Sequence, residues 1–150
     1  MKMGHAMSQP ESEPAIEYRT GRPEDIEEVK ELFRADGELS FVAIGVLAHD
    51  DLVFWLAGDR GRLVGVILTR PLPSEAGPRY GGVDELLVVA GHRRKGIGRH
   101  LMDLAEAHYR AAGLAGMQLV VVEDNRPARL LYENLGYGIV QRRLRMAKDF

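Results

Sequence analysis

The sequence contains no cysteine, and this absence removes several kinds of chemistry at once. Without thiols the chain has no disulfide, no thiolate metal site and no cysteine nucleophile. No apolar run approaches the roughly 20 residues that a membrane-spanning helix needs, and no signal-peptide stretch opens the chain. A large excess of either charge is lacking too, because 20 basic and 22 acidic residues give a formal net charge of −2. We therefore expect a cytoplasmic protein that attracts neither nucleic acid nor an anionic membrane.

The composition is that of an ordinary globular protein. Hydrophobic residues make up 45% of the 150 residues and charged residues 28%, which suits one domain with a single core. Residues 1–14 have little to bury and are expected to form a flexible leader. The domain is accordingly expected over residues 15–150.

Hydrophobic periodicity predicts strands and helices in alternation. Strands are expected over 16–19, 52–57, 63–69, 83–89, 117–122 and 137–146, and helices over 23–37, 97–112 and 127–135. Residues 38–49 fit either a short helix or a buried loop. The turn at 58–61 joins its two strands as a hairpin, and the continuous apolar run 117–122 predicts a central strand covered on both faces. This order indicates an α/β (α+β) fold.

The most informative segment is a strand that runs into a basic turn and then a helix. The turn reads Arg93-Arg94-Lys95-Gly96-Ile97-Gly98-Arg99. The first amides of a helix are unpaired donors at the positive end of its dipole, so they suit a phosphate. Gly96 and Gly98 leave room for a diphosphate close to the backbone. Leu101 replaces the third glycine of the dinucleotide fingerprint, and no Gly-Lys-Ser or Gly-Lys-Thr occurs, so both of those motifs fail. The alternative is a basic turn that only caps a surface helix.

Together with a downstream segment, this turn resembles the GCN5-related N-acetyltransferase (GNAT) superfamily. Residues 93–98 are similar to its pyrophosphate-binding signature, Gln/Arg-x-x-Gly-x-Gly/Ala. Residues 125–137, Asn-Arg-Pro-Ala-Arg-Leu-Leu-Tyr-Glu-Asn-Leu-Gly-Tyr, resemble its second motif, in which an Asn leads into a helix that bears a Tyr. The two motifs follow each other about thirty residues apart, and the order of elements also matches.

The resemblance implies a single domain with a mixed sheet and helices on both faces. Its central strands, 83–89 and 117–122, would splay apart around acetyl-coenzyme A. It further implies that the cofactor is held by backbone groups of Leu86, Leu87 and Val88, by residues 93–99 at the diphosphate, and by Asn125. Asn125 also suits a helix cap before Pro127. No metal is expected, because His92 and His100 lack the spacing of ligands.

The implied activity is transfer of an acetyl group to a primary amine by direct attack in a ternary complex. The resemblance makes Tyr132 the general acid, and a phenol stays protonated at neutral pH; spacing alone would favour a core aromatic. Asp84 and Glu85 are the candidate bases, and Glu85 is preferred. Neighbouring strand residues point to opposite faces, so only one of the two is expected to face the cleft. Glu123, Asp124 and a water chain are open alternatives.

The acceptor is expected to be a small-molecule amine, with a peptide or protein amine as the other option and a homodimer left open. The resemblance implies an acceptor pocket built from residues 36–50 and 71–82. Its expected walls are Phe41, Trp55 and Tyr80, and the acids expected to attract a cationic amine are Glu38, Asp50, Asp51 and Glu75. The alternative function is a non-catalytic coenzyme A-binding sensor or partner module, against which the presence of Tyr132 argues.

Overall fold

The computed structural model describes residues 15–36 and 41–150, which fall into two compact units. The larger unit ends at Val120, and the smaller one is Val121–Phe150. The predicted leader, residues 1–14, lies outside the described residues. Each unit is described by itself below.

The larger unit is built around a mixed β-sheet. In the described ranges its strands are β1 (Glu17–Thr20), β2 (Val53–Asp59), β3 (Arg62–Pro71), β4 (Tyr80–Val88) and β5 (Gly116–Leu119). They lie in the order β1-β2-β3-β4-β5, with β4 and β5 parallel and the other neighbours antiparallel. The α/β (α+β) class and the mixed sheet are therefore confirmed.

Helices α1 (Ile26–Ala35), α2 (Phe41–Leu47) and α3 (Ile97–Ala111) accompany this sheet, with short 3-10 turns η2 (Pro23–Asp25) and η3 (Ala90–His92). The ambiguous segment 38–49 thus contains a helix. The predicted hairpin between β2 and β3 is confirmed, and its turn residues Arg60 and Gly61 have φ angles of 52° and 80°. Both positive values suit the turn that matches the twist of two antiparallel strands.

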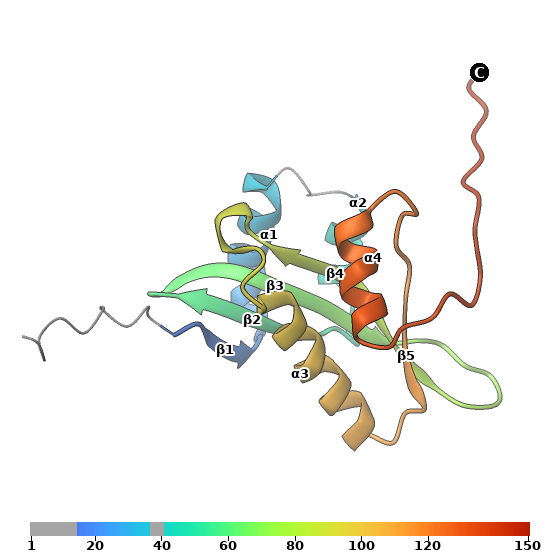
Figure 1. Ribbon diagram of the computed structural model, residues 1–150, viewed down its shortest axis with the longest axis horizontal. Coiled ribbons are helices and arrows are strands. Elements are labelled where there is room, and N and C mark those ends of the chain that lie inside the picture. Colours follow the sequence, from blue (N-terminus) through green and yellow to red (C-terminus); the bar gives the residue numbers. More distant parts are fainter. Residues whose placement is uncertain (1–14, 37–40) are drawn as a thin grey trace, which may run out of the picture. The chain divides into compact units, whose positions relative to one another are not determined.

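Helices lie on both sides of the central strands (Figure 1). One face of β2 and β3 packs on α1 and α2, in a core formed by Val29, Phe33, Val46, Leu47, Phe54, Leu56, Val66 and Leu68. The opposite face meets α3, where the Thr69 hydroxyl lies 2.8 Å from the Tyr109 hydroxyl and Trp55 packs edge-on against His108. Helices therefore cover both faces of the sheet, as expected.

The start of α1 is held by a buried carboxylate. Asp25 accepts hydrogen bonds of 2.7 Å from both terminal nitrogens of Arg19 and one of 2.8 Å from the backbone N–H of Arg22. The hydrogen bonds from Arg19 hold the pKa of Asp25 below its usual value. Asp25 thus ties β1 to the start of α1.

Two expectations for the later strands are wrong. The run 117–122 was expected to be central, but β5 ends at Leu119 and lies at one end of the strand order. Val120 and Val122 are 76% and 71% exposed. An apolar run indicates β propensity, whereas burial on both faces depends on which elements lie beside the strand.

The smaller unit contains helix α4 (Arg126–Asn134), which confirms the helix predicted at 127–135. The strand predicted at 137–146 is absent, because these described residues have no regular structure. Ile139, Val140, Leu144 and Met146 are exposed there. Alternating apolar residues make a strand only where a neighbouring strand takes up their backbone hydrogen bonds.

Candidate active site

The sheet is open between β4 and β5. Their parallel register runs from Tyr80 opposite Gly116 to Val83 opposite Leu119, where β5 ends. β4 continues to Val88 while still paired with β3 on its other side. From residue 84 to residue 88, the outer edge of β4 therefore has no strand partner within the described ranges.

Alternation of the backbone decides which groups face this open edge. The N–H of Val89 donates to the carbonyl of Val64 at 2.9 Å, next to the pair Val88–Gly65. In an antiparallel ladder every second residue directs its N–H and C=O to the partner strand. Leu87 therefore bonds toward β3, and Leu86 and Val88 face the open edge. Of the three residues predicted to pair with the cofactor, Leu87 directs its backbone N–H and C=O to β3 and not to the open edge.

The basic turn beyond this edge leads directly into α3. Gly96 precedes the helix with φ = 80° and ψ = 8°, a left-handed conformation that favours glycine. A Cβ atom at Gly96 would meet nothing within 4 Å, so backbone conformation is the reason for this glycine in the protein itself.

The first turn of α3 offers unpaired donors. The first intrahelical bond runs from His100 N–H to the Gly96 carbonyl at 3.0 Å, so the amides of Ile97, Gly98 and Arg99 have no partner inside the helix. The residue that begins the helix makes no capping side-chain bond either. These amides point along the positive end of the helix dipole, which attracts anions.

Cationic side chains surround these amides. Arg93, Arg94, Lys95 and Arg99 are exposed, whereas Ile97 is 1% exposed and anchors the helix. Arg93 donates through Nε to the carbonyl of Val88 at 2.8 Å and lies 3.5 Å from Asp36. The predicted diphosphate residues are thus gathered in one place, with the side chain of Ile97 as the structural exception.

A further pair beside this turn was missed by sequence reasoning. His92 in η3 lies 2.7 Å, Nε2 to Oδ2, from Asp59 at the end of β2. The hydrogen bond with His92 lowers the pKa of Asp59. This contact joins the entrance of the basic turn to the β2–β3 hairpin. No local pattern could reveal it, since the two residues are 33 positions apart.

An extra residue in β4 changes how the two candidate bases lie. Glu85 is opposite Leu68 and Val83 is opposite Thr69, which leaves Asp84 without a partner across the pair. Such a bulge interrupts the alternation of side chains along a strand. Asp84 reaches Arg70, two residues beyond Leu68 and thus on the same face of β3.

Asp84 and Glu85 therefore both point to the face covered by α1 and α2. The expectation that they point to opposite faces is wrong, and the extra residue is the reason. The preference for Glu85 over Asp84 rested on that alternation, so both carboxylates stay candidate bases.

Asp84 is engaged by a guanidinium group. Arg70 donates from Nε and a terminal nitrogen to the two carboxylate oxygens, at 2.9 and 3.3 Å. The hydrogen bonds to Asp84 raise the pKa of Arg70. The other terminal nitrogen of Arg70 lies 3.5 Å from Nε2 of His49, whose Nδ1 accepts from the N–H of Asp51 at 3.3 Å. A chain of polar contacts thus leads from β4 to the segment after α2.

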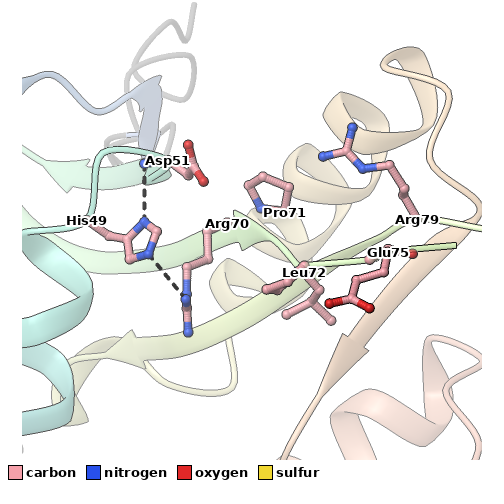
Figure 2. Close-up of a pocket in the computed structure, with 9 residues that line it drawn as sticks. His49, Asp51, Arg70, Pro71, Leu72, Glu75 and Arg79 are labelled. Atoms are coloured by element: carbon pink, nitrogen blue, oxygen red, sulfur yellow. Dashed lines mark hydrogen bonds between the residues drawn. The ribbon is translucent and has the colours of Figure 1, made fainter.

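Arg70 also lines a cavity of about 540 Å³ (Figure 2). The rest of the lining comes from the segment after α2 and from the loop between β3 and β4: His49, Asp51, Pro71, Leu72, Pro73, Ser74, Glu75 and Arg79. A second cavity, of about 390 Å³, shares Asp51, Pro71 and Arg79 and extends to His108 and Tyr109 of α3.

Cavities lie where the sequence predicted the acceptor pocket, and their use as an acceptor site stays a prediction. Asp51 and Glu75 line the first cavity, and Asp50 lines the second. Trp55 and Tyr80 line neither; Trp55 packs against His108, and Tyr80 covers Gly116. Glu38 and the side chain of Phe41 lie outside the described residues.

The smaller unit contains the two remaining predicted residues. Asn125 caps α4, because its Oδ1 accepts from the N–H of Ala128 at 3.3 Å. Tyr132 lies on α4, half-buried, with its ring 6.1 Å from that of Tyr137. The cap is thus confirmed; the cofactor contact of Asn125 and the acid role of Tyr132 remain predictions.

Two features are absent from the part of the chain that the structure describes. No helix in the described ranges is long and apolar enough to cross a membrane. Residues 15–36 and 41–150 contain no group of three or more His, Asp or Glu side chains placed to hold a metal ion.

Comparison with known proteins begins at the family level. Residues 12–137 match the model of the "Acetyltransferase (GNAT) family". A stretch of 90 residues is 39% identical to the mycothiol acetyltransferase of Geodermatophilus obscurus, and the corresponding enzyme of Thermomonospora curvata is 38% identical over 89 residues. These stretches cover 59% of this chain but only 29% and 28% of the relatives, so the match spans less than a third of their length.

Solved structures share the fold at lower identity. The ribosomal-protein-alanine N-acetyltransferase of Brucella melitensis biovar Abortus 2308 superposes with a TM-score of 0.73 at 23% identity, covering 89% of this chain and all of that one. AAC(6')-Iy, solved with a bisubstrate analogue of coenzyme A, gives 0.73 at 14% identity over 91% of this chain and 99% of that one.

Proposed function

The chain belongs to the acetyltransferase (GNAT) family, and on this premise we propose that it transfers the acetyl group of acetyl-coenzyme A to a primary amine. The open edge of β4 that leads into the unpaired amides of α3 is the observation that supports this most. In coenzyme A an extended pantetheine arm with two amides is joined to a diphosphate, and this strand edge and this turn suit these two parts in that order.

The residues fit the cofactor by charge and by backbone pattern. The amides of Ile97, Gly98 and Arg99, together with the exposed Arg94 and Lys95, would hold the diphosphate. Leu86 and Val88 would offer backbone groups to the pantetheine arm, as a neighbouring strand does. When bound, acetyl-coenzyme A supplies the thioester carbonyl that the amine attacks.

The chain itself must then move protons. An alkylamine has a pKa near 10, so at neutral pH it must lose a proton before its nitrogen can form the new C–N bond. Glu85 or Asp84, directly or through a water molecule, would accept that proton. As the C–S bond breaks, Tyr132 would donate its phenolic proton to the sulfur. The amine thus becomes an amide, and the cofactor leaves as the free thiol.

The second candidate is a module that binds coenzyme A without catalysis. The ion pair of Asp84 with Arg70 favours it, because both oxygens of this carboxylate are already occupied by hydrogen bonds from the guanidinium. Glu85 lies on the same face of β4 and is the other candidate base in the catalytic proposal.

Two measurements test the proposal. Acetyl-coenzyme A at millimolar concentration should raise the melting temperature, because a ligand that binds only the folded state stabilises it. Release of coenzyme A in the presence of a panel of primary amines should exceed the amine-free rate. Binding without amine-dependent release would support the module, and no binding would contradict both candidates.

A further inference from the structure

We infer that the amine acceptor also carries a carboxylate, so that the preferred substrate is a small zwitterion such as an amino acid or a short peptide. The inference rests on the proposed function, because it takes the 540 Å³ cavity as the acceptor site. It concerns the charges of that cavity, which the acetyl-transfer chemistry alone does not dictate.

The cavity lies beside the candidate bases. Arg70 is one of its lining residues, and the same guanidinium holds Asp84 at 2.9 Å. Glu85 shares the face of β4 on which Asp84 lies. An amine that enters the cavity near Arg70 and Asp51 is therefore close to a carboxylate that can take its proton. The volume is within the range of about 300–1,000 Å³ that is usual for small-molecule sites.

Charges of both signs line the cavity, and they lie at different places along it. In Figure 2 His49 and Asp51 lie on one side of Arg70, and Glu75 and Arg79 lie on the other, beyond Pro71 and Leu72. Asp51 and Glu75 form no ion pair among the described residues. Either carboxylate suits an ammonium group of the ligand.

The two arginines are not equivalent. Arg70 is already paired with Asp84 through two hydrogen bonds. The side chain of Arg79 forms no hydrogen bond or ion pair within 15–36 and 41–150; only its backbone carbonyl is engaged, by the N–H of Ala115. Arg79 also lines the second cavity, so this residue lies where the two cavities adjoin. A guanidinium of this kind matches a carboxylate with two parallel hydrogen bonds.

These charges discriminate between classes of amine. A polyamine would leave Arg79 unpaired and would meet its positive charge. A ligand with only negative charge would meet Asp51 and Glu75. A zwitterion satisfies both ends, with its ammonium group toward Asp51 and its carboxylate toward Arg79.

The test compares matched acceptors that differ only in the carboxylate. Coenzyme A release is measured with an amino acid, its carboxamide and the corresponding decarboxylated amine, at saturating acetyl-coenzyme A. We expect kcat/KM to be about tenfold higher for the acid, the lower end of what a charged hydrogen bond contributes. Arg79→Gln should abolish this preference, mainly by raising KM for the acid. Arg79→Lys should retain part of it.

Arg62→Gln is the matched control, because Arg62 is an exposed arginine at the far end of β3 from Arg70. Equal or faster turnover of the decarboxylated amine by the unaltered protein would overturn the inference while leaving acetyl transfer intact. A preference for the acid that survives Arg79→Gln would overturn the role of Arg79. If acetyl-coenzyme A binds but no member of the panel releases coenzyme A, the proposed activity itself fails, and the inference fails with it.

Discussion

The basic turn, residues 93–99, and the cavity beside Arg70 are built in opposite ways. The turn is one continuous stretch, residues 93–99, and its donors are backbone amides reinforced by exposed cations. The cavity takes its lining from three separate places, which are His49 with Asp51, residues 70–75, and Arg79, and its chemistry is that of side chains. Backbone amides need only a local conformation, whereas a set of side chains needs the whole fold to bring it together. The proposed cofactor site therefore depends on local backbone conformation, and the proposed acceptor site depends on side chains that the fold brings together.

The largest loss of activity is expected when both candidate bases are removed. The double variant Asp84→Asn/Glu85→Gln should lower kcat/KM for the amine by about 10²–10⁴-fold, the usual contribution of a general base. The loss should be greatest below neutral pH, where the amine holds its proton most firmly. Steady-state rates across pH would measure it, with Asp103→Asn on the exposed face of α3 as the control.

The single variants then separate the two carboxylates. If Asp84 serves mainly to hold Arg70, Asp84→Asn should affect the melting temperature and the KM of the acceptor more than kcat. Glu85→Gln should then account for most of the loss in kcat. An unchanged pH–rate profile in the double variant would leave water or another acid as the proton acceptor.

Tyr132→Phe should have a smaller effect. The substitution deletes one hydroxyl and no core volume, and a thiol with a pKa near 8.5 leaves fairly well without help. We expect kcat and kcat/KM to fall together by roughly ten- to a thousand-fold, with an unchanged dissociation constant for the cofactor. Kinetics beside a cofactor titration would measure this. Full activity would make Tyr132 a packing residue beside Tyr137.

On the cofactor side, the double variant Arg94→Gln/Lys95→Gln should raise the dissociation constant of acetyl-coenzyme A by about tenfold, since exposed cations contribute modestly. The effect should shrink at high salt because of screening. Titration calorimetry would measure it, with Arg110→Gln in the last turn of α3 as the control. An equal loss of cofactor affinity in the Arg94→Gln/Lys95→Gln and Arg110→Gln variants would show that the basic turn has no special role in binding the cofactor.

The smallest effect on catalysis is expected from Asp25, which touches neither region. Its pKa is lowered in the folded protein mainly by the hydrogen bonds from Arg19, so its stabilising contribution is present above its unfolded pKa and is lost as pH falls through its folded pKa. Asp25→Asn should lower the free energy of unfolding by about 1–3 kcal/mol at neutral pH. The difference from the unaltered protein should narrow below about pH 4. Denaturant unfolding across pH would measure it, and a difference that persists in acid would contradict the ionic origin.

Much of the fold was predictable because its signals are local. The positive φ angles at Arg60 and Gly61 belong to a turn that the glycine of the hairpin already indicated. The helical stripe before Gly37 and the one from Ile97 to Ala111 were both found by their period. The predictions failed where a segment had to be covered or paired by its neighbours, as at Val120 and Val122 and along 137–146. Hydrophobic periodicity does not say which elements lie beside a segment.

The sequence by itself determined most of the order of elements and the place of the basic turn, since both follow from backbone preferences within a few residues. Only the tertiary structure decided that Asp84 and Glu85 share a face, that Arg70 holds Asp84, and that Arg79 stays unpaired in the cavity wall among the described residues. The physical reason is that a bulge, an ion pair and a cavity each depend on strands and loops that approach one another from distant parts of the chain.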